Sequence, residues 1–411
     1  MEDKKVHGTE TAGQHEHEHE HRKLEFVYMC RENTLYNLTP FNQKRLDIEV
    51  VGLKTSDLLA IHDVIEKLPA HLSVKQFLGL DRFKTLLSTQ FPNKLITRGS
   101  NSDSSISIKS RNSFQTLEHK AYLELVVKLK ADYFVSLSEE TTVDPHAPAG
   151  KKSDKRSLKK TLAFLQETLD FLREKKITEQ VVLAPFLDTE FDIVRQDMIA
   201  ALREKAGSIG GIMVYGTGDA VEGGPSFEHR TKVLRELRPL VESEFMRKKV
   251  IGNCSDGNFV DVLLKVNEGF NFFEASYPFD LAEKGHAINF VPEEWLKQYE
   301  KYDGHSEHME EGRLRQDVDL FIRRVPTLDL NLAEFMQHKD SIFPLLENYP
   351  LKGYSKAYIC HLLNNQEMTG NVLLTIHNCF VYQEFFRVLN RREFRANKFG
   401  LIYSFCKFVC K

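Results

Sequence analysis

The sequence predicts an α/β protein whose parallel strands close into a (β/α) barrel, and two observations lead to this prediction. Short runs of β-branched residues alternate with amphipathic, helix-like segments over residues 181–273, a pattern typical of repeated βαβ units and a parallel sheet. The chain has 411 residues, of which 41% are hydrophobic, so it can bury a large core. This length favours a closed barrel over an open sheet.

The clearest part of the pattern begins with a strand at Val181–Ala184 and a helix at Glu190–Lys205, in which apolar residues recur at helical spacing. The same alternation then repeats down the chain. The further elements expected are strands at Ile212–Val214, Val250–Ile251 and Phe270–Phe273, and helices at Phe227–Val241 and Asn258–Asn267. Nearer the start we expect a strand at Phe26–Tyr28 and a helix at Ser56–Lys67.

Loops between these elements decide where a site can lie, because function in a (β/α) barrel resides in the loops after the carboxyl ends of its strands. Such loops are expected at Pro185–Thr189, Val214–Gly224, Gly252–Asp256 and Glu274–Pro278. Other segments are expected to be surface excursions, namely the Ser-rich loop Ser100–Ser110, the linker Asp144–Asp154 and the charged insertion Glu300–Arg313.

The charge balance argues against a nucleic-acid-binding module that acts alone. The chain has 56 basic and 59 acidic residues and a net charge of −3, so contact with a polyanion must come from a local patch. The sequence contains no zinc finger, aromatic RNA-binding run or Walker-type phosphate loop. One basic cluster is either a solvated helix face or a contact for nucleic-acid phosphates, and it comprises Lys151, Lys152, Lys155, Arg156, Lys159 and Lys160.

The chain is expected to be cytoplasmic. Its six cysteines lack the spacing of a secreted disulfide framework, and the sequence has neither a signal-peptide core nor an apolar run long enough to span a membrane. Residues 1–23 are rich in His and Glu and are expected to be disordered, with weak, adventitious metal binding at most. The same tract could also be a purification device.

Acidic residues at predicted strand ends are the candidates for chemistry. Glu274 follows the strand Phe270–Phe273, and Glu139 with Glu140 follows the apolar run Tyr133–Leu137. A carboxylate in such a position can act as a nucleophile or a general base, although acidic loop residues are mostly solvated. Gly216–Val221 looks like the start of a dinucleotide-binding turn but lacks its third glycine, so a flexible barrel loop is the favoured interpretation.

Four collinear stretches resemble the tRNA-guanine transglycosylase family. Residues 353–363 (GYSKAYICHLL) with 373–378 (LLTIHN) resemble the S/T-R-A-Y-x-H-H-L and T-x-H-N motifs of its zinc-binding subdomain. Residues 132–140 (DYFVSLSEE), 209–214 (IGGIMV) and 272–278 (FFEASYP) resemble its D-I-V-M-A-F-D-E, I-G-G-L-S-V and M-F-D-C-V-x-P segments. The resemblance spans Ser105 to Phe386 and implies a (β/α)8 TIM-type barrel with a C-terminal subdomain. We therefore divide the chain into a disordered segment 1–23, a barrel with insertions 24–335 and a C-terminal subdomain 336–411.

The family's catalytic residues are not matched. Glu274 stands where the family has its nucleophilic aspartate, with the carboxylate one methylene further out, and a misplacement of about 1 Å can cost roughly a hundredfold in rate. Ser138 stands where an aspartate reads the guanine edge, and it lacks the charge to accept from two ring donors. The D-S-G-G-F-Q motif, with the general acid/base aspartate, has no counterpart between Val74 and Ser110. The family's R-N-A-R-N-G stretch is replaced by FDLAEKG at residues 279–285.

The zinc ligands of the family are also mostly missing. The family binds zinc through a C-x-C-x2-C motif and the histidine of the later H-N pair. Leu346, Asn348 and Leu351 stand at the cysteine positions, and only His377 is retained. No zinc or other cofactor is therefore expected, and packing alone is expected to stabilise the subdomain. A rearranged site built from Cys360, Cys379, Cys406 and Cys410 is an alternative without diagnostic spacing.

These losses are typical of the family's accessory subunit, whose F-E-S-x-x-P strand end resembles residues 273–278 (FEASYP). The resemblance implies a heterodimer with a catalytic subunit that exchanges guanine for queuine at the anticodon wobble position of GUN-anticodon tRNAs. This chain would dimerise and position the tRNA, with Lys151, Lys152, Lys155 and Arg156 as candidate contacts. The family also implies a peripheral location at the mitochondrial outer membrane, although nothing here resembles an anchor. Alternatives are a diverged, active homodimer with Glu274 as nucleophile, and a barrel scaffold without a tRNA role.

Overall fold

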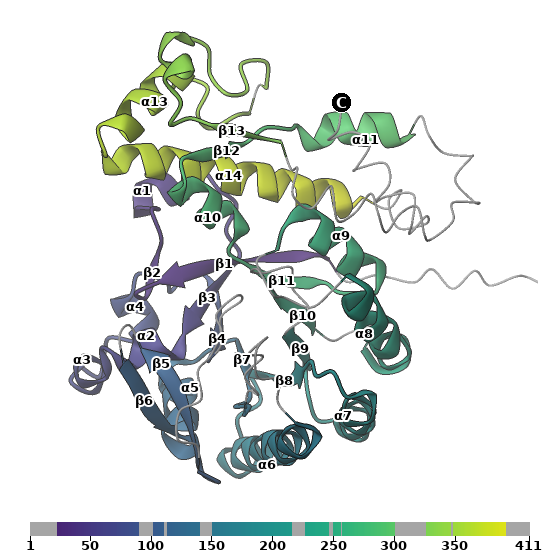
Figure 1. Ribbon diagram of the computed structural model, residues 1–411. Coiled ribbons are helices and arrows are strands. Elements are labelled where there is room, and N and C mark those ends of the chain that lie inside the picture. Colours follow the sequence, from purple (N-terminus) through teal and green to yellow (C-terminus); the bar gives the residue numbers. More distant parts are fainter. Residues whose placement is uncertain are drawn as a thin grey trace, which may run out of the picture.

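The computed structural model describes residues 23–89, 102–110, 113–139, 150–215, 227–245, 250–255, 257–300, 326–346 and 348–391. Figure 1 shows a ring of strands surrounded by helices, with further helices and short strands packed along one side. Several predicted features lie outside the described residues: the segment 1–23 except Lys23, the segment Gly216–Val221, and the insertion Glu300–Arg313 except Glu300.

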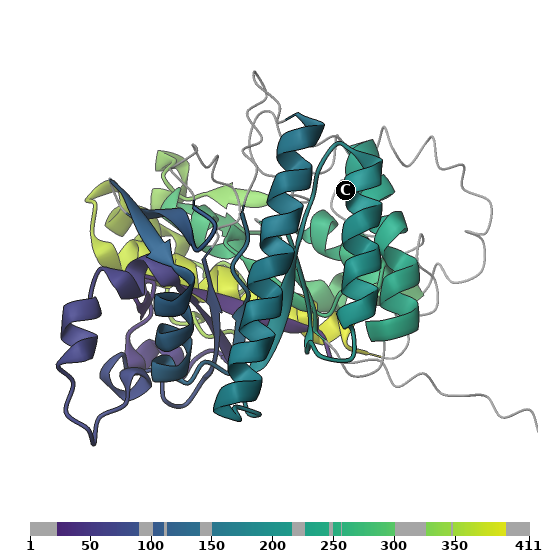
Figure 2. The same cartoon turned by 90° about the horizontal axis from the view of Figure 1, so that it is seen from below.

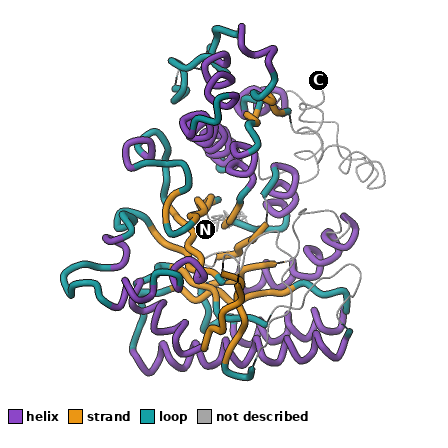
Figure 3. The backbone as a smooth tube through the Cα atoms, turned by 60° about the vertical axis from the view of Figure 1, so that its left-hand side comes forward, coloured by secondary structure: helices purple, strands orange, loops and turns teal. Residues whose placement is uncertain are grey.

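The central strands form a closed parallel barrel, which confirms the predicted fold class. In order around the ring they are β1 (Glu25–Arg31), β3 (Val50–Lys54), β4 (Lys84–Ser88), β7 (Tyr133–Val135), β8 (Val181–Leu187), β9 (Gly211–Tyr215), β10 (Val250–Ser255) and β11 (Phe272–Ala275). The ring closes where β11 pairs with β1 in parallel, with Glu25 beside Phe272. In Figure 3 these strands occupy the centre and the helices lie outside them.

Helices connect successive strands and cover the outside of the barrel. The longest of these connecting helices, α6 (Lys151–Lys175), stands out in Figure 2 and buries Phe164, Leu165, Leu169 and Leu172 at helical spacing. The other helices on this wall are α5 (His119–Leu129), α7 (Asp192–Lys205), α8 (Phe227–Leu240), which continues as a π-helical turn Val241–Phe245, and α9 (Phe259–Asn267). Shorter elements near the start are β2 (Thr34–Leu35), α1 (Pro40–Gln43), α2 (Thr55–Leu59), α3 (His62–Glu66) and α4 (Val74–Phe77).

The last helix, α14 (Met368–Leu389), covers the seam where the barrel closes. The Tyr382 ring lies 4.7 Å from that of Phe26 on β1, and the Phe386 ring lies 5.3 Å from that of Phe273 on β11. Asn390 follows the helix, and its side chain accepts a hydrogen bond from Leu24 N (2.8 Å) and donates one to Leu24 O (3.1 Å). The two ends of the described chain are therefore tied together across 366 positions.

A group of shorter elements lies between β11 and α14. These are α10 (Tyr277–Glu283), β12 (His286–Ile288), α11 (Pro292–Glu300), β13 (Thr327–Asp329), the 3-10 helix η2 (Ala333–Gln337) and α13 (Lys356–Asn364). β12 and β13 pair antiparallel. The predicted boundary between residues 335 and 336 falls inside η2 and stays a prediction. Within the described ranges, no helix has the length and apolar character needed to cross a membrane.

Several local predictions were wrong. The second half of the predicted loop Ser100–Ser110 is a strand, β5 (Ser105–Ser110), which pairs with β6 (Ser113–Glu118) because Ile106, Ile108 and Leu117 bury one face of the hairpin. The predicted helix Ser56–Lys67 is two short helices, α2 and α3. The predicted linker Asp144–Asp154 ends in helix from Lys151 onward. Five strands run further than expected, namely β1 to Arg31, β8 to Leu187, β9 to Tyr215, β10 to Ser255 and β11 to Ala275.

Candidate functional site

The Glu274 side chain lies inside the barrel. The ring of Phe272, two residues earlier on β11, lies 5.2 Å from the Tyr133 ring of β7, a strand that is not adjacent to β11, so Phe272 faces the interior. Phe273 faces outward to Phe386 of α14. Because side chains alternate along a strand, Glu274 points inward like Phe272, one layer nearer the carboxyl end. It has no exposed surface.

Other side chains close the same end of the barrel. Ser138, which follows β7, is only 3% exposed. The Tyr215 hydroxyl at the end of β9 lies 3.2 Å from the Ser88 hydroxyl at the end of β4, and two strands, β7 and β8, separate β4 from β9 in the ring. This hydrogen bond therefore crosses the mouth of the barrel.

Glu139, another sequence candidate, is held by helix α6. Its backbone N–H donates to the Thr161 hydroxyl (3.1 Å), and the Ser157 hydroxyl donates to its carbonyl oxygen. Its carboxylate lies 3.6 Å from the ammonium of Lys160, which is 8% exposed. Glu139 therefore ties the loop after β7 to α6. The prediction that the basic cluster is a solvated helix face is wrong for Lys160, because this side chain is buried. Glu140 lies outside the described residues.

The sequence did not reveal an ion pair at the rim of the barrel. Asp188 directly follows β8, and its side chain is 7% exposed. Its Oδ2 accepts a hydrogen bond of 2.7 Å from Nε2 of His229, in the first turn of α8. Burial raises the pKa of the Asp188 carboxyl, and the hydrogen bond to Asp188 raises the pKa of His229. The pair can therefore hold a proton at this rim.

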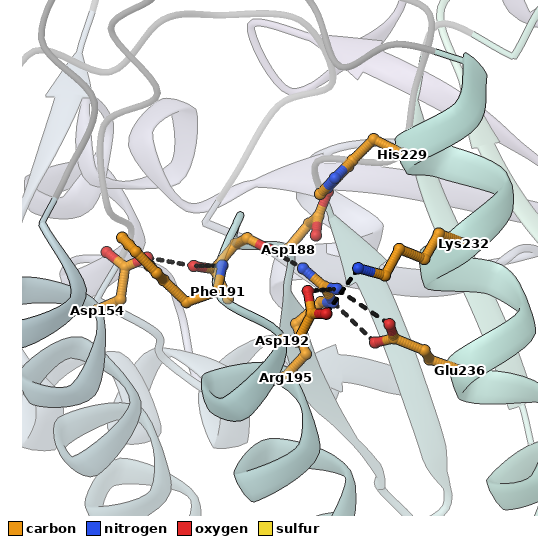
Figure 4. Close-up of polar contacts among 9 residues, drawn as sticks. Asp154, Asp188, Phe191, Asp192, Arg195, His229, Lys232 and Glu236 are labelled. Atoms are coloured by element: carbon orange, nitrogen blue, oxygen red, sulfur yellow. Dashed lines mark hydrogen bonds and ion pairs between the residues drawn. The ribbon is translucent and has the colours of Figure 1, made fainter.

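Arg195 of α7 fixes the backbone beside this pair, as Figure 4 shows. The guanidinium has no exposed surface and donates to the carbonyl oxygen of Thr189. It also bonds Glu236 through Nε (2.8 Å) and Nη2 (3.0 Å), and Asp192 through Nη2 (2.6 Å). Lys232 adds a contact of 2.6 Å to Asp192. Charge-assisted bonds in this number hold the residues after Asp188 in one conformation.

A small hollow of about 20 Å³, partly open to solvent, lies beside Asp188. Its walls come from α6, α7 and the end of β8, and include Asp154, Thr189, Val194 and Met198. Thr189 donates its hydroxyl proton to Asp154, which joins the start of α6 to the end of β8. No residue of β11 lines this hollow, so it is separate from the position of Glu274.

The basic cluster lies at the same rim. Lys151, Lys152, Lys155, Arg156 and Lys159 are exposed on the first turns of α6. Their place at the carboxyl end of the barrel follows from the Asp154–Thr189 contact, since Thr189 follows β8. The first turns of α6 therefore present positive charge next to the barrel mouth.

The residues at the family's zinc positions do not form a set of metal ligands, because two of them are leucines. Asn348 is exposed, Leu346 is half-buried, and Leu351 is buried. Both ring nitrogens of His377 are engaged: Nδ1 lies 2.6 Å from the Tyr349 hydroxyl and Nε2 lies 2.7 Å from the carbonyl oxygen of Ile288. The donor set therefore does not fit zinc. Within the described ranges, no group of three or more His, Cys, Asp or Glu residues could hold a metal ion.

Of the cysteines proposed for a rearranged site, the described ones, Cys360 and Cys379, belong to no group of three or more possible metal ligands among the described residues. The Cys360 thiol donates to the carbonyl oxygen of Leu332 (3.4 Å), and burial raises the pKa of both Cys360 and Cys379. Cys406 and Cys410 lie outside the described residues. Sequence reasoning also missed Tyr349, although it lies between Asn348 and Leu351 at the former ligand positions.

Comparison with protein families matches residues 12–404 to the family described as queuine tRNA-ribosyltransferase. The chain is 24% identical over 345 residues to the queuine tRNA-ribosyltransferase accessory subunit 2 of Anopheles gambiae, covering 82% of this chain and 72% of that protein. Identity to the protein of the same name in Homo sapiens is 22% over 356 residues, covering 84% and 82%. A queuine tRNA-ribosyltransferase-like protein of Plasmodium falciparum is 26% identical over 294 residues, covering 69% and 66%. With a family match over nearly its whole length and a closed (β/α) barrel, this chain belongs to the queuine tRNA-ribosyltransferase family.

Proposed function

We propose that this chain is the non-catalytic subunit of a heterodimeric queuine tRNA-ribosyltransferase. The observation that carries the proposal is the state of the nucleophile position. Glu274 stands there in place of aspartate, faces the barrel interior and has no exposed surface. A nucleophile must come within about 3–3.5 Å of the carbon that it attacks, so a buried and longer carboxylate is unsuited to this role.

A catalytic partner then exchanges guanine for queuine at the anticodon wobble position. The names of the Anopheles and human relatives, which call them accessory subunits, support such a pairing. Ser138 supports it further, because a neutral hydroxyl cannot replace the carboxylate that reads two ring donors of guanine.

We also propose that this subunit helps to position the tRNA. The exposed side chains of Lys151, Lys152, Lys155 and Arg156 stand close together at the rim of the barrel. Clustered cations of this kind bind phosphates of the nucleic-acid backbone without reading sequence. Because the chain has a net charge of −3, only this local patch can attract the tRNA backbone. The partner would therefore supply the remaining contacts to the tRNA.

Incorporation of labelled guanine or queuine into tRNA tests the proposal. The isolated chain should incorporate none, whereas a mixture with the catalytic subunit should be active. A complex that carries Glu274→Gln in this chain should keep its activity, because the carboxylate takes no part in the reaction. Thermal unfolding of the variant checks that it is folded.

Two rival functions give different results in this assay. If the isolated chain exchanges the base and Glu274→Gln abolishes the exchange, the chain is an active, diverged enzyme that works as a homodimer. If the chain neither joins a transglycosylase nor affects its activity, it is a barrel scaffold without a tRNA role.

A further inference from the structure

We propose that the C-terminal subdomain folds without a metal ion and that the Tyr349 hydroxyl has taken the metal's place on His377. A hydrogen-bonded chain, Tyr349–His377–Ile288, would then do the structural work that zinc does in the family. The proposal concerns the architecture of the subdomain and does not depend on the proposed function.

The geometry defines the proton positions in this chain of contacts. Nε2 of His377 lies 2.7 Å from the carbonyl oxygen of Ile288, which can only accept, so Nε2 carries the proton. Nδ1 then has a lone pair, which accepts the proton of the Tyr349 hydroxyl at 2.6 Å. A metal ion needs this lone pair as its binding site. Both nitrogens of the neutral imidazole are thus hydrogen-bonded to protein groups, and neither is left to bind a metal ion.

The surroundings favour a neutral, dry contact. His377 has no exposed surface, and burial lowers its pKa to about 4. The ring of Phe343 lies 5.0 Å from the His377 ring, and the ring of Phe380 lies 5.7 Å from that of Tyr349. These aromatic side chains fill the space around the contact, where cysteine thiolates would be needed to neutralise zinc.

The neighbouring Asn378 shows what the contact holds in place. Its side chain accepts from Ile288 N (2.9 Å) and donates to the carbonyl oxygens of His286 (3.0 Å) and Pro278 (3.1 Å). His377 and Asn378 together therefore fasten α14 to β12 and to the start of α10. The H-N pair, which resembles a metal-binding motif in sequence, works here as a hydrogen-bonding clamp. The sequence led us to expect that packing alone stabilises the subdomain, but these hydrogen bonds contribute as well.

Metal content and chelation provide the first test on the full chain. After dialysis against a strong chelator, which also strips the His-rich segment, the protein should hold no stoichiometric zinc and its melting temperature should be unchanged. Retention of one zinc per chain, or a melting temperature that falls on chelation and recovers with zinc, would overturn the proposal.

Substitution of the tyrosine tests the role of its hydroxyl. Tyr349→Phe removes only that group and leaves Nδ1 of His377 buried without a donor, so the unfolding equilibrium constant should rise about tenfold. Tyr358→Phe on α13 is the matched control, because Tyr358 is 44% exposed. Equal stability of the two variants would contradict the proposal.

Nitrogen NMR of His377 in the wild-type chain keeps the proposal testable if Tyr349→Phe does not fold. The ring should show the neutral Nε2–H tautomer with a hydrogen-bonded Nδ1 throughout the neutral pH range. A shift pattern of metal-bound imidazole, or an Nδ1–H tautomer, would rule out the proposed chain of contacts.

Discussion

Asp188 and His229 form a rim contact whose strength depends on pH. The hydrogen bond to Asp188 holds the pKa of His229 above its ordinary value of 6.5, which means that folding favours the protonated imidazole. The resulting contribution to stability is fully present below pH 6.5 and is lost as the pH rises through the raised pKa of the folded state. Burial raises the pKa of the Asp188 carboxyl, which means that folding disfavours its charged form.

The first prediction concerns this pair. His229→Asn should destabilise the chain most in mildly acidic solution, above the titration range of carboxyl groups, and the deficit should shrink at alkaline pH. Urea unfolding of wild type and variant over this range gives the difference directly. A deficit that grows with pH would show that the imidazole is neutral in the folded state.

Arg195 should be the most sensitive residue of the network in Figure 4. Arg195→Met keeps much of the side-chain length but leaves Glu236, which is 17% exposed, without its cation. Removing one partner of a buried ion pair costs about 3–5 kcal/mol in unfolding free energy. Denaturant unfolding measures the loss.

Lys232→Met is the matched control for this prediction. Lys232 also pairs with Asp192, but both side chains are at least half exposed, so the loss should stay below about 1 kcal/mol. Similar losses for Arg195→Met and Lys232→Met would contradict the structural role assigned to Arg195.

At the level of elements, α6 combines two roles. Its middle and end bury apolar residues against the barrel, whereas its first turns carry exposed cations at the rim. We expect Lys151→Ala with Lys155→Ala to weaken tRNA binding by the complex. The slope of the logarithm of affinity against the logarithm of salt concentration should fall by about one for each phosphate that the variant no longer neutralises.

The opposite end of the same helix provides the control for this experiment. Arg173→Ala with Lys175→Ala removes the same charge from exposed positions at the other end of the barrel. This pair should leave both the affinity and the salt slope nearly unchanged. Equal effects of the two pairs would indicate a response to net charge rather than a contact at the rim.

Strand β9 begins at a position where only glycine fits. A Cβ atom on Gly211 would lie 1.9 Å from the carbonyl oxygen of Val250, in the neighbouring strand β10. Gly211→Ala should therefore force the two strands apart and lower the melting temperature by several degrees. Gly353→Ala, where a Cβ would meet nothing within 4 Å, is the control and should have little effect.

Local patterns predicted the elements well where burial is one-sided and the chain is regular. The strands β8, β9 and β10 carry β-branched runs, and α7 and α9 carry helical spacing, so each was placed correctly to within a few residues. The β5–β6 hairpin was missed because serine residues alternate with the apolar residues of β5, so that the segment looks like a Ser-rich loop. Ile106 and Leu117 form a buried apolar pair only when the hairpin brings them opposite each other.

Over the whole molecule, resemblance to the family supplied what periodicity could not. It predicted the number of barrel strands, and the closed ring confirms the architecture. Contacts between distant parts of the chain were out of reach. Asp188 and His229 are 41 positions apart, and Tyr349 and His377 are 28 apart, so neither pairing leaves a signal in a single sequence.

The hydrogen bonds between Leu24 and Asn390, which join the two ends of the described chain, have a consequence for synthesis of the protein. Strand β1 leaves the ribosome before the other barrel strands, and its partner β11 and its covering helix α14 are synthesised much later. Until then β1 carries an unpaired edge and the Phe26 ring has no cover, both of which promote aggregation. The barrel therefore cannot close before β11 has been synthesised, and up to that point the open edge of β1 is a site at which the chain can aggregate.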